Sequence, residues 1–504
     1  MMEQPVAYYG YPTKKRELIF GLFISLISLL LCNCLIYGGL NLGFGLAVIC
    51  AVVCTGVYLL SCGCRLTPYS GCLLGLSLVL AASFARSDDA FVKFVTACFL
   101  LVSSNLGLCL LAGKNRFSTG TVATLADSVA TFFQLGVGEL PRSWHGLSNA
   151  FRSSGKLGKT GGAFLLGLCF AIPMLCVLIP LLIRADRAFE GLVALLPEFD
   201  LAQLVVTLIL GGCLACVLYT RGTALCYHTP PVSPVASARK GLSSITVNTF
   251  LGAVTLVYVA YLISQLAYFV GGFAGILPEE YTLSQYARRG FYEMAWLCGL
   301  NLGIIALSLG LSEKRFPAPL STRLLCLFLG LVTVFLVAAA SAKMFLYIES
   351  YGLTRLRVLT QVVMLFLALS VILVCLRLFF HRFPYMKAVI LAGLLIAGSV
   401  SWVDVDTQVA RYNVQTYLAG GLKTVDVEYL STLGDGALPY VQQLTQAEDP
   451  QVASQAKAVL ECREWVQPEI RQWNYVNQQA GNYLPHVPEF TEASQEDIIF
   501  EIRP

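Results

Sequence analysis

The residues best suited to chemistry in this sequence are charged and aromatic side chains at the ends of apolar segments. Arg289 and Glu293, for example, are four residues apart, which suits an ion pair on one helix face. Such a cluster could bind an anionic headgroup or a cell-surface precursor. It could equally dock one part of the chain on another, and we favour docking. We call this set the rim cluster; it comprises Arg288, Arg289, Glu293, Lys343, Tyr347, Tyr351, Arg355, Arg357, Asp404, Asp406 and Arg411.

A second polar group lies inside one apolar segment. Tyr258, Tyr261, Gln265 and Tyr268 are spaced so that one stripe of a helix carries all four. A polar stripe on a membrane helix faces protein or water, because lipid would leave its hydrogen-bonding groups unpaired. The stripe is therefore either a substrate path or a hydrogen-bonded seam between helices, and we favour the seam.

Motifs for metal or phosphate chemistry are absent or weak. Gly158-Lys159-Thr160 resembles the end of a phosphate-binding loop, but position 153 is serine and an apolar segment follows. Cys62, Cys64 and Cys72 lack a fourth ligand nearby, and the four histidines have no spacing suited to zinc. We predict no metal, no cofactor and no catalytic residue. The net charge of +4 gives no reason to expect a nucleic-acid partner.

The elements that would position these residues are membrane helices. The chain is 57% hydrophobic and only 13% charged, against about 25% charged in soluble domains, so lipid is its solvent. About eleven apolar runs are long enough to cross a bilayer. They lie near 17–37, 42–61, 71–86, 91–112, 161–183, 201–220, 246–272, 293–311, 324–346, 358–380 and 387–403.

The loop charges predict an orientation. If the N-terminus is cytoplasmic, the inside segments carry eighteen Lys and Arg residues and the outside loops carry seven, which is a positive-inside bias. We therefore expect a multi-pass plasma-membrane protein with its C-terminus outside. The first apolar run has no cleavage site in a typical place, so we expect it to remain as a helix.

The predicted fold is all-α, a polytopic transmembrane bundle with a small extracytoplasmic helical domain. Within it, residues 118–140 form an amphipathic helix that either lies in the interface or packs under the bundle. The predicted parts are a cytoplasmic segment 1–16, four spans in 17–112, a cytoplasmic loop 113–160, seven spans in 161–403, the outer helical domain 404–484 and a flexible tail 485–504.

Local signals predict the helices of the outer domain. Asp406 is expected to cap a helix that runs to about Leu418. Asp449 followed by Pro450 is a strong start for another helix, which we expect to end near Trp465. Pro468 is expected to start a further helix.

Three segments resemble one known family. They are 286–293 (YARRGFYE), 351–357 (YGLTRLR) and 404–439 with its Asp404, Asn413 and Ala437-Leu438-Pro439. Their order and spacing resemble bacterial domain of unknown function 4173, over roughly residues 160–480, and a cousin family shares the Tyr-Gly-Leu-Thr segment. The resemblance implies a bacterial cell-membrane protein and supplies no activity.

Two functions remain open at this stage. The first is a membrane-embedded scaffold or sensor whose partners are the lipid bilayer and a membrane or envelope protein bound through 404–484. The second is a transporter, or a protein that handles lipids or envelope precursors, with a polar path through the seventh and ninth helices. A membrane enzyme ranks last, because no nucleophile, acid–base pair or metal site is gathered in one place.

Overall fold

The computed structural model describes residues 14–114, 123–153, 201–227, 242–273, 291–311, 319–380, 382–463 and 467–484, with the isolated positions 174, 178, 182 and 465. Within these ranges the regular elements are helices, and no strand occurs. The expected all-α class is thus confirmed. The tail 485–504 and, apart from the three isolated positions 174, 178 and 182, the predicted span 161–183 lie outside the described residues.

Nine helices among the described residues are long and apolar enough to cross a membrane, which confirms a polytopic helix bundle. A tenth helix, Glu293–Leu309, is apolar but shorter. The nine are Lys15–Gly38, Leu42–Ser61, Pro68–Ala85, Ala90–Leu111, Ala202–Tyr227, Ser244–Ser264, Leu320–Tyr351, Arg355–Phe379 and Tyr385–Val403. Each of these ten helices overlaps an apolar run expected from the sequence.

The chain forms two compact units, and each is described by itself. The first contains α1 (Lys15–Asn33), η1 (Cys34–Gly38), α2 (Leu42–Ser61), α3 (Pro68–Ala82), η2 (Ser83–Ala85), α4 (Ala90–Leu111), α5 (Ala123–Phe133), η3 (Gln134–Gly138), α6 (Leu140–Ser153) and α9 (Leu201–Tyr227).

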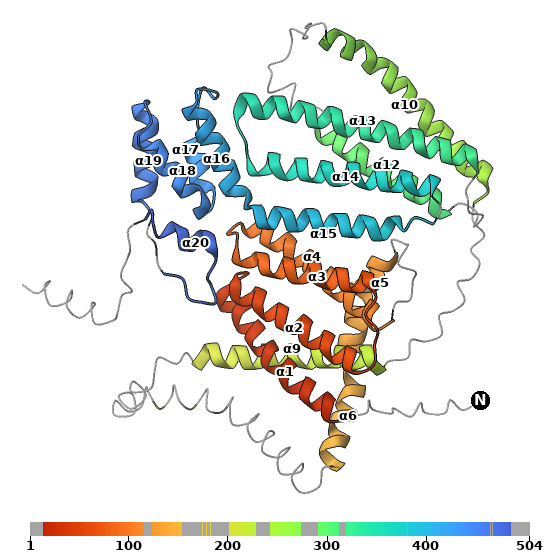
Figure 1. Ribbon diagram of the computed structural model, residues 1–504, viewed down its shortest axis with the longest axis vertical. Coiled ribbons are helices and arrows are strands. Elements are labelled where there is room, and N and C mark those ends of the chain that lie inside the picture. The colour runs from red at the N-terminus through yellow and green to blue at the C-terminus, as the bar shows by residue number, and fades with distance from the viewer. Residues whose placement is uncertain are drawn as a thin grey trace, which may run out of the picture. The chain divides into compact units, whose positions relative to one another are not determined.

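Helices α1 and α9 are antiparallel neighbours in the first unit (Figure 1). The Tyr227 hydroxyl at the end of α9 donates to Glu17 Oε1 at the start of α1, over 2.6 Å. At the other end Asn33 Nδ2 donates to Thr207 Oγ1 over 3.3 Å. These two contacts fix the register of the pair, since each polar group satisfies one on the facing helix.

Helix α5 packs with its polar face inward. Ser128 and Thr131 are buried, whereas Val129 and Phe133 are 47% and 61% exposed. A helix in water would bury the opposite face. Exposure of the apolar face suits lipid as the neighbour, because lipid imposes no cost on apolar surface.

The second unit contains five long helices and a set of short ones. The long helices are α10 (Ser244–Phe273), α12 (Phe291–Leu311), α13 (Leu320–Tyr351), α14 (Arg355–Phe379) and α15 (Tyr385–Val403). Helix α13 packs against α10, α12 and α14 and supplies much of their common core, including Leu329, Leu336 and Ala340.

The short helices follow α15 (Figure 1), and those from α16 to α19 share a core of their own. They are α16 (Val405–Leu418), α17 (Val427–Thr432), η4 (Asp435–Ala437), α18 (Leu438–Leu444), α19 (Pro450–Glu461) and α20 (Tyr475–Ala480). Val409, Val414 and Leu444 are fully buried in this core.

Two local expectations for these helices are wrong and one is confirmed. Asp404 rather than Asp406 occupies the N-cap of α16, and Asp406 in the first turn is bound elsewhere. Residues 468–474 form turns rather than a helix, and Ile470 is 85% exposed. The Asp449 side chain does cap α19, accepting from Gln451 N over 2.9 Å.

Residues Pro468–Tyr475 belong to the first unit and lie at one end of its helices. Trp473 O accepts from Leu42 N over 3.1 Å, and Gln472 Nε2 donates to Tyr37 O over 3.0 Å. Tyr37 and Leu42 flank the turn between α1 and α2, so this segment and the Lys15 end of α1 lie at opposite ends of the helices.

Candidate functional site

The described part of the rim cluster is built around the joint between α13, α14 and α16. Helix α13 ends at Tyr351, Gly352 takes a φ of 73°, and the Thr354 side chain caps α14. Arg355 therefore leaves the first turn of α14 beside the first turn of α16. Its Nε donates to Asp406 Oδ1 over 2.7 Å, and its Nη2 donates to Asp406 Oδ2.

This bidentate pair is largely withdrawn from solvent. The Asp406 side chain is 2% exposed and the Arg355 side chain 33%. Asp406 Oδ2 also accepts from Gly434 N over 3.2 Å, which ties in the segment before η4. A charge-assisted bidentate pair of this kind is strong and restricts the relative orientation of its two groups. It therefore fixes α16 and η4 against the start of α14.

A second joint uses neutral groups. Asn413 of α16 accepts from Leu353 N over 2.6 Å and donates to Leu353 O over 2.8 Å. A Cβ added at Gly352 would lie 2.7 Å from Asn413 Oδ1. Glycine at this position therefore serves both the positive φ and the close approach of α16.

Tyr429 connects α17 to the same turn. Its hydroxyl accepts from Arg355 N over 2.8 Å. Burial raises the pKa of this hydroxyl above its ordinary value, so Tyr429 is neutral at physiological pH. The backbone of Arg355 is thus held by α17 while its side chain is held by α16.

Arg357 and two tyrosines form the part of the rim cluster nearest the end of α13. The Arg357 guanidinium lies 4.1 Å from the centre of the Tyr347 ring, and the Tyr347 and Tyr351 rings are 5.0 Å apart. Arg357 Nη1 also donates to Tyr351 O over 3.2 Å. The contact of a cation with an aromatic face is favourable. Here it holds the Arg357 side chain against the last turn of α13.

The remaining rim residues are placed differently. Asp404 is 4% exposed and accepts from the Thr407 hydroxyl within its own helix. Arg411 is exposed and its Nε is 3.4 Å from Gln415 Oε1. Lys343 is partly buried one turn before Tyr347, and Glu293 is exposed in the first turn of α12. Arg288 and Arg289 lie outside the described residues.

The tyrosine stripe meets a hydrogen-bonded chain across three helices. Tyr258 of α10 donates to Asn301 Oδ1 of α12 over 2.7 Å, and Asn301 Nδ2 donates to Thr333 Oγ1 of α13 over 3.0 Å. Asn301 and Thr333 are fully buried. Tyr261 packs against the same core. The side chains of Gln265 and Tyr268 lie outside the described residues.

A polar cluster in the first unit was missed by sequence reasoning. Arg221 of α9 is 7% exposed; its Nη2 donates to Asn105 Oδ1 of α4, and its guanidinium lies 5.1 Å from the Phe132 ring centre. Asn105 Nδ2 donates to Ser128 Oγ of α5 over 2.8 Å. No described carboxylate lies within ion-pair distance of Arg221, and its Nε has no partner among the described residues.

The signal for this cluster was present but ambiguous. Asn105 stands in the middle of an apolar run, where a polar residue is costly unless it meets another. The apolar run predicted at 201–220 ends one residue before Arg221, so the sequence does not place this side chain among the helices. Helix α9 instead continues to Tyr227, which places Arg221 within the bundle.

One family model matches this chain. It is described as Domain of unknown function (DUF4153) and covers residues 72–444. The match does not confirm the domain of unknown function 4173 that the three sequence segments resemble. Neither the curated proteins nor the solved structures contain a match.

Proposed function

Because the chain belongs to the family described as Domain of unknown function (DUF4153), which assigns no activity, we propose a function from the geometry of this integral membrane protein. The protein is a membrane-embedded scaffold or sensor, and its C-terminal helices within 404–484 bind a membrane or envelope protein. The buried pair between Arg355 and Asp406 is the observation that carries this proposal.

The pair supports a scaffold because Arg355 and Asp406 bind each other and so connect α14 to α16, which leaves neither charge available for a ligand. Breaking a buried pair by removing one partner costs about 3–5 kcal/mol. With the Asn413 contacts to Leu353, it holds α16 to α18 in one orientation on the membrane helices. A surface presented in a fixed orientation loses less entropy when a partner binds.

The surface available for a partner includes one face of α16. Arg411, Gln415 and Leu418 follow helical spacing and are exposed, and Tyr412 lies beside them. Leu418 is 49% exposed and Tyr412 is 37% exposed. Aromatic and arginine side chains are enriched at protein interfaces, so this face suits a partner with apolar and acidic groups.

The orientation we propose keeps the N-terminus cytoplasmic and residues 404–504 outside the plasma membrane. The charge bias of the loops supports it. The position of Pro468–Tyr475, at the opposite end of the first unit from Lys15, agrees with it.

Site-specific photo-crosslinking tests the proposal. A photoreactive residue at Leu418 should capture one discrete membrane or envelope protein in intact cells, and Arg411→Glu should remove that product because it reverses the charge of the face. A probe at Gln455, exposed on α19, is the matched control. The same products from both positions, or products that survive Arg411→Glu, would exclude this face as the binding surface.

A further inference from the structure

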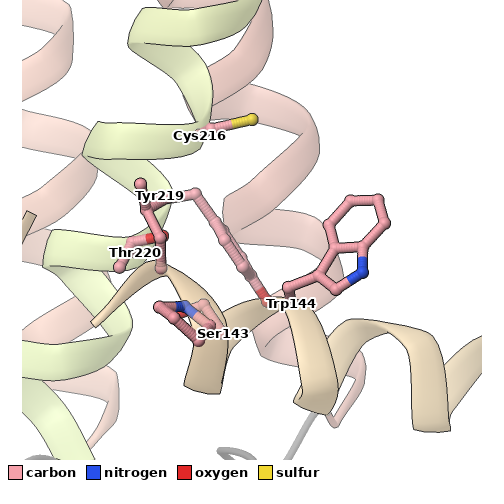
Figure 2. A pocket seen from close by; sticks show the side chains of 7 residues that line it. Ser143, Trp144, Cys216, Tyr219 and Thr220 are labelled. Carbon is pink, nitrogen blue, oxygen red and sulfur yellow. The ribbon is translucent and has the colours of Figure 1, made fainter. Parts of the chain in front are cut away.

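A hollow of about 340 Å³ lies between α6 and α9 in the first unit (Figure 2). Figure 2 shows Ser143 and Trp144 on α6 facing Cys216, Tyr219 and Thr220 on α9. This volume is within the range of small-molecule sites. The lining residues are Leu140, Pro141, Ser143, Trp144, Cys216, Tyr219 and Thr220.

The hollow lies at the level of lipid chains. Thr220 and Cys216 precede Tyr227 by seven and eleven residues, or roughly 10 and 16 Å at the helical rise of 1.5 Å per residue. Tyr227 is bound to Glu17 and Arg16, so it marks the polar end of the span. A hydrocarbon half-thickness is about 15 Å, with several more ångströms of headgroup region outside it, which places the hollow at the depth of the acyl chains of one leaflet.

The surface that lines this hollow is almost entirely apolar. The Ser143 hydroxyl lies 3.2 Å from Thr223 Oγ1, a contact that pins α6 across α9. Thr223 Oγ1 also donates to carbonyls of its own helix. A polar solute would gain little here, whereas an acyl chain would make van der Waals contacts with the lining side chains.

The residues that border the hollow are of the types found at membrane interfaces. Trp144 is 70% exposed beside it, and tryptophan favours the headgroup level. Arg142, held by Glu139 at 2.9 Å, adds a basic group on the same helix. Val137 of η3, which contacts α6, is 51% exposed. The exposed apolar surface therefore extends from α6 onto η3.

We propose that this hollow binds one acyl chain of a phospholipid from the leaflet at the Lys15 end of the bundle. The headgroup lies beside Trp144 and Arg142, and the chain enters between α6 and α9. The occupant is lipid because the hollow opens from a membrane-spanning helix at acyl-chain depth and because an apolar surface surrounds it. The site is independent of the scaffold function proposed above.

Two measurements on the full-length protein in phospholipid nanodiscs test this site. Trp144 emission, taken as the difference between wild type and Trp144→Phe, should be quenched more by phospholipid brominated near the headgroup end of its chain than near the chain terminus. After exchange into detergent, native mass spectrometry should find phospholipid retained on the wild-type protein.

Cys216→Phe should fill the hollow and lose the retained lipid. Cys213→Phe is the matched control, because Cys213 is exposed on the same helix and does not line the hollow; it should keep the retained lipid. Trp144→Ala, which removes one wall and leaves the Ser143 contact, should also lose retained lipid if Cys216→Phe fails to fold. Retention in the filled variant equal to that in Cys213→Phe, or in Trp144→Ala equal to wild type, would overturn the proposal.

Discussion

At the scale of single residues, the joint around Gly352 shows how one backbone position constrains a distant helix. Its φ of 73° is costly for any other residue, and the space beside it is taken by Asn413, sixty-one positions later. Arg355 and Asp406 are separated by 51 positions and yet form the strongest contact of the rim cluster. Both contacts hold α16 against the turn between α13 and α14.

Gly352→Ala should destabilise the protein by more than the strain of its backbone alone. A side chain in the left-handed region costs about 1–2 kcal/mol, and the new Cβ would also displace Asn413 from Leu353. Gly420→Ala is the control, since Gly420 has a φ of 78° and open space around it. Thermal unfolding in detergent should show a larger fall in Tm for Gly352→Ala; equal falls would mean that the contact with Asn413 contributes nothing.

Asp406→Asn should lower the free energy of unfolding by about 3 kcal/mol, near the lower end of the range for a buried pair because Arg355 is one-third exposed. Arg411→Gln, at an exposed rim position, should change it by less than about 0.5 kcal/mol. Combining Arg355→Met with Asp406→Asn should cost less than the sum of the single changes. A strictly additive double variant would show that the two side chains do not interact.

At the scale of elements, buried hydrogen bonds decide how helices meet. Asn301 joins α10 to α13 by accepting from Tyr258 and donating to Thr333. In the first unit, Asn105 likewise joins α9 to α5. Both asparagines are buried, and a buried amide without a partner would be costly. These contacts support the interpretation of Tyr258 as part of a packing seam.

Asn301→Ala should destabilise the second unit because it leaves the Tyr258 hydroxyl and the Thr333 hydroxyl short of a partner. Hydrogen bonds between membrane helices contribute about 0.6–1.7 kcal/mol each. Asn248→Ala provides the comparison, since Asn248 also joins α10 to α13, through Ser321 and Thr322, but is less buried than Asn301. Chemical denaturation should report a smaller loss for Asn248→Ala, and the reverse order would contradict the seam.

At the scale of the whole molecule, the chain is two compact units of membrane helices, and the second unit also contains α16 to α19. An odd number of crossings would separate the N-terminus from the helices after α15. The first unit agrees with an odd number of crossings. In it, Pro468–Tyr475 lies against the turn between α1 and α2, at the opposite end of α1 from Lys15.

A protease-sensitive tag after Pro504 should therefore be removed by protease added outside intact spheroplasts. The same tag placed before Met1 should be cleaved only after lysis, because the positive-inside bias predicts a cytoplasmic N-terminal segment. Immunoblotting for each tag reports the result. Protection of the C-terminal tag until lysis would reverse or break the proposed topology, and with it the outer location of α16 to α19.

The sequence by itself determined which of the described helices are long and apolar enough to cross a membrane, because the length of an apolar run is a local property. It also identified Asp449 as a cap, since capping involves neighbours in the chain. It misassigned Asp406, whose carboxylate binds Arg355, and its predicted span 201–220 ended before Arg221, which lies within α9. Only the tertiary structure decided these pairings, because helix packing brings together polar groups that lie tens of residues apart, and a buried group takes whichever partner the packing provides.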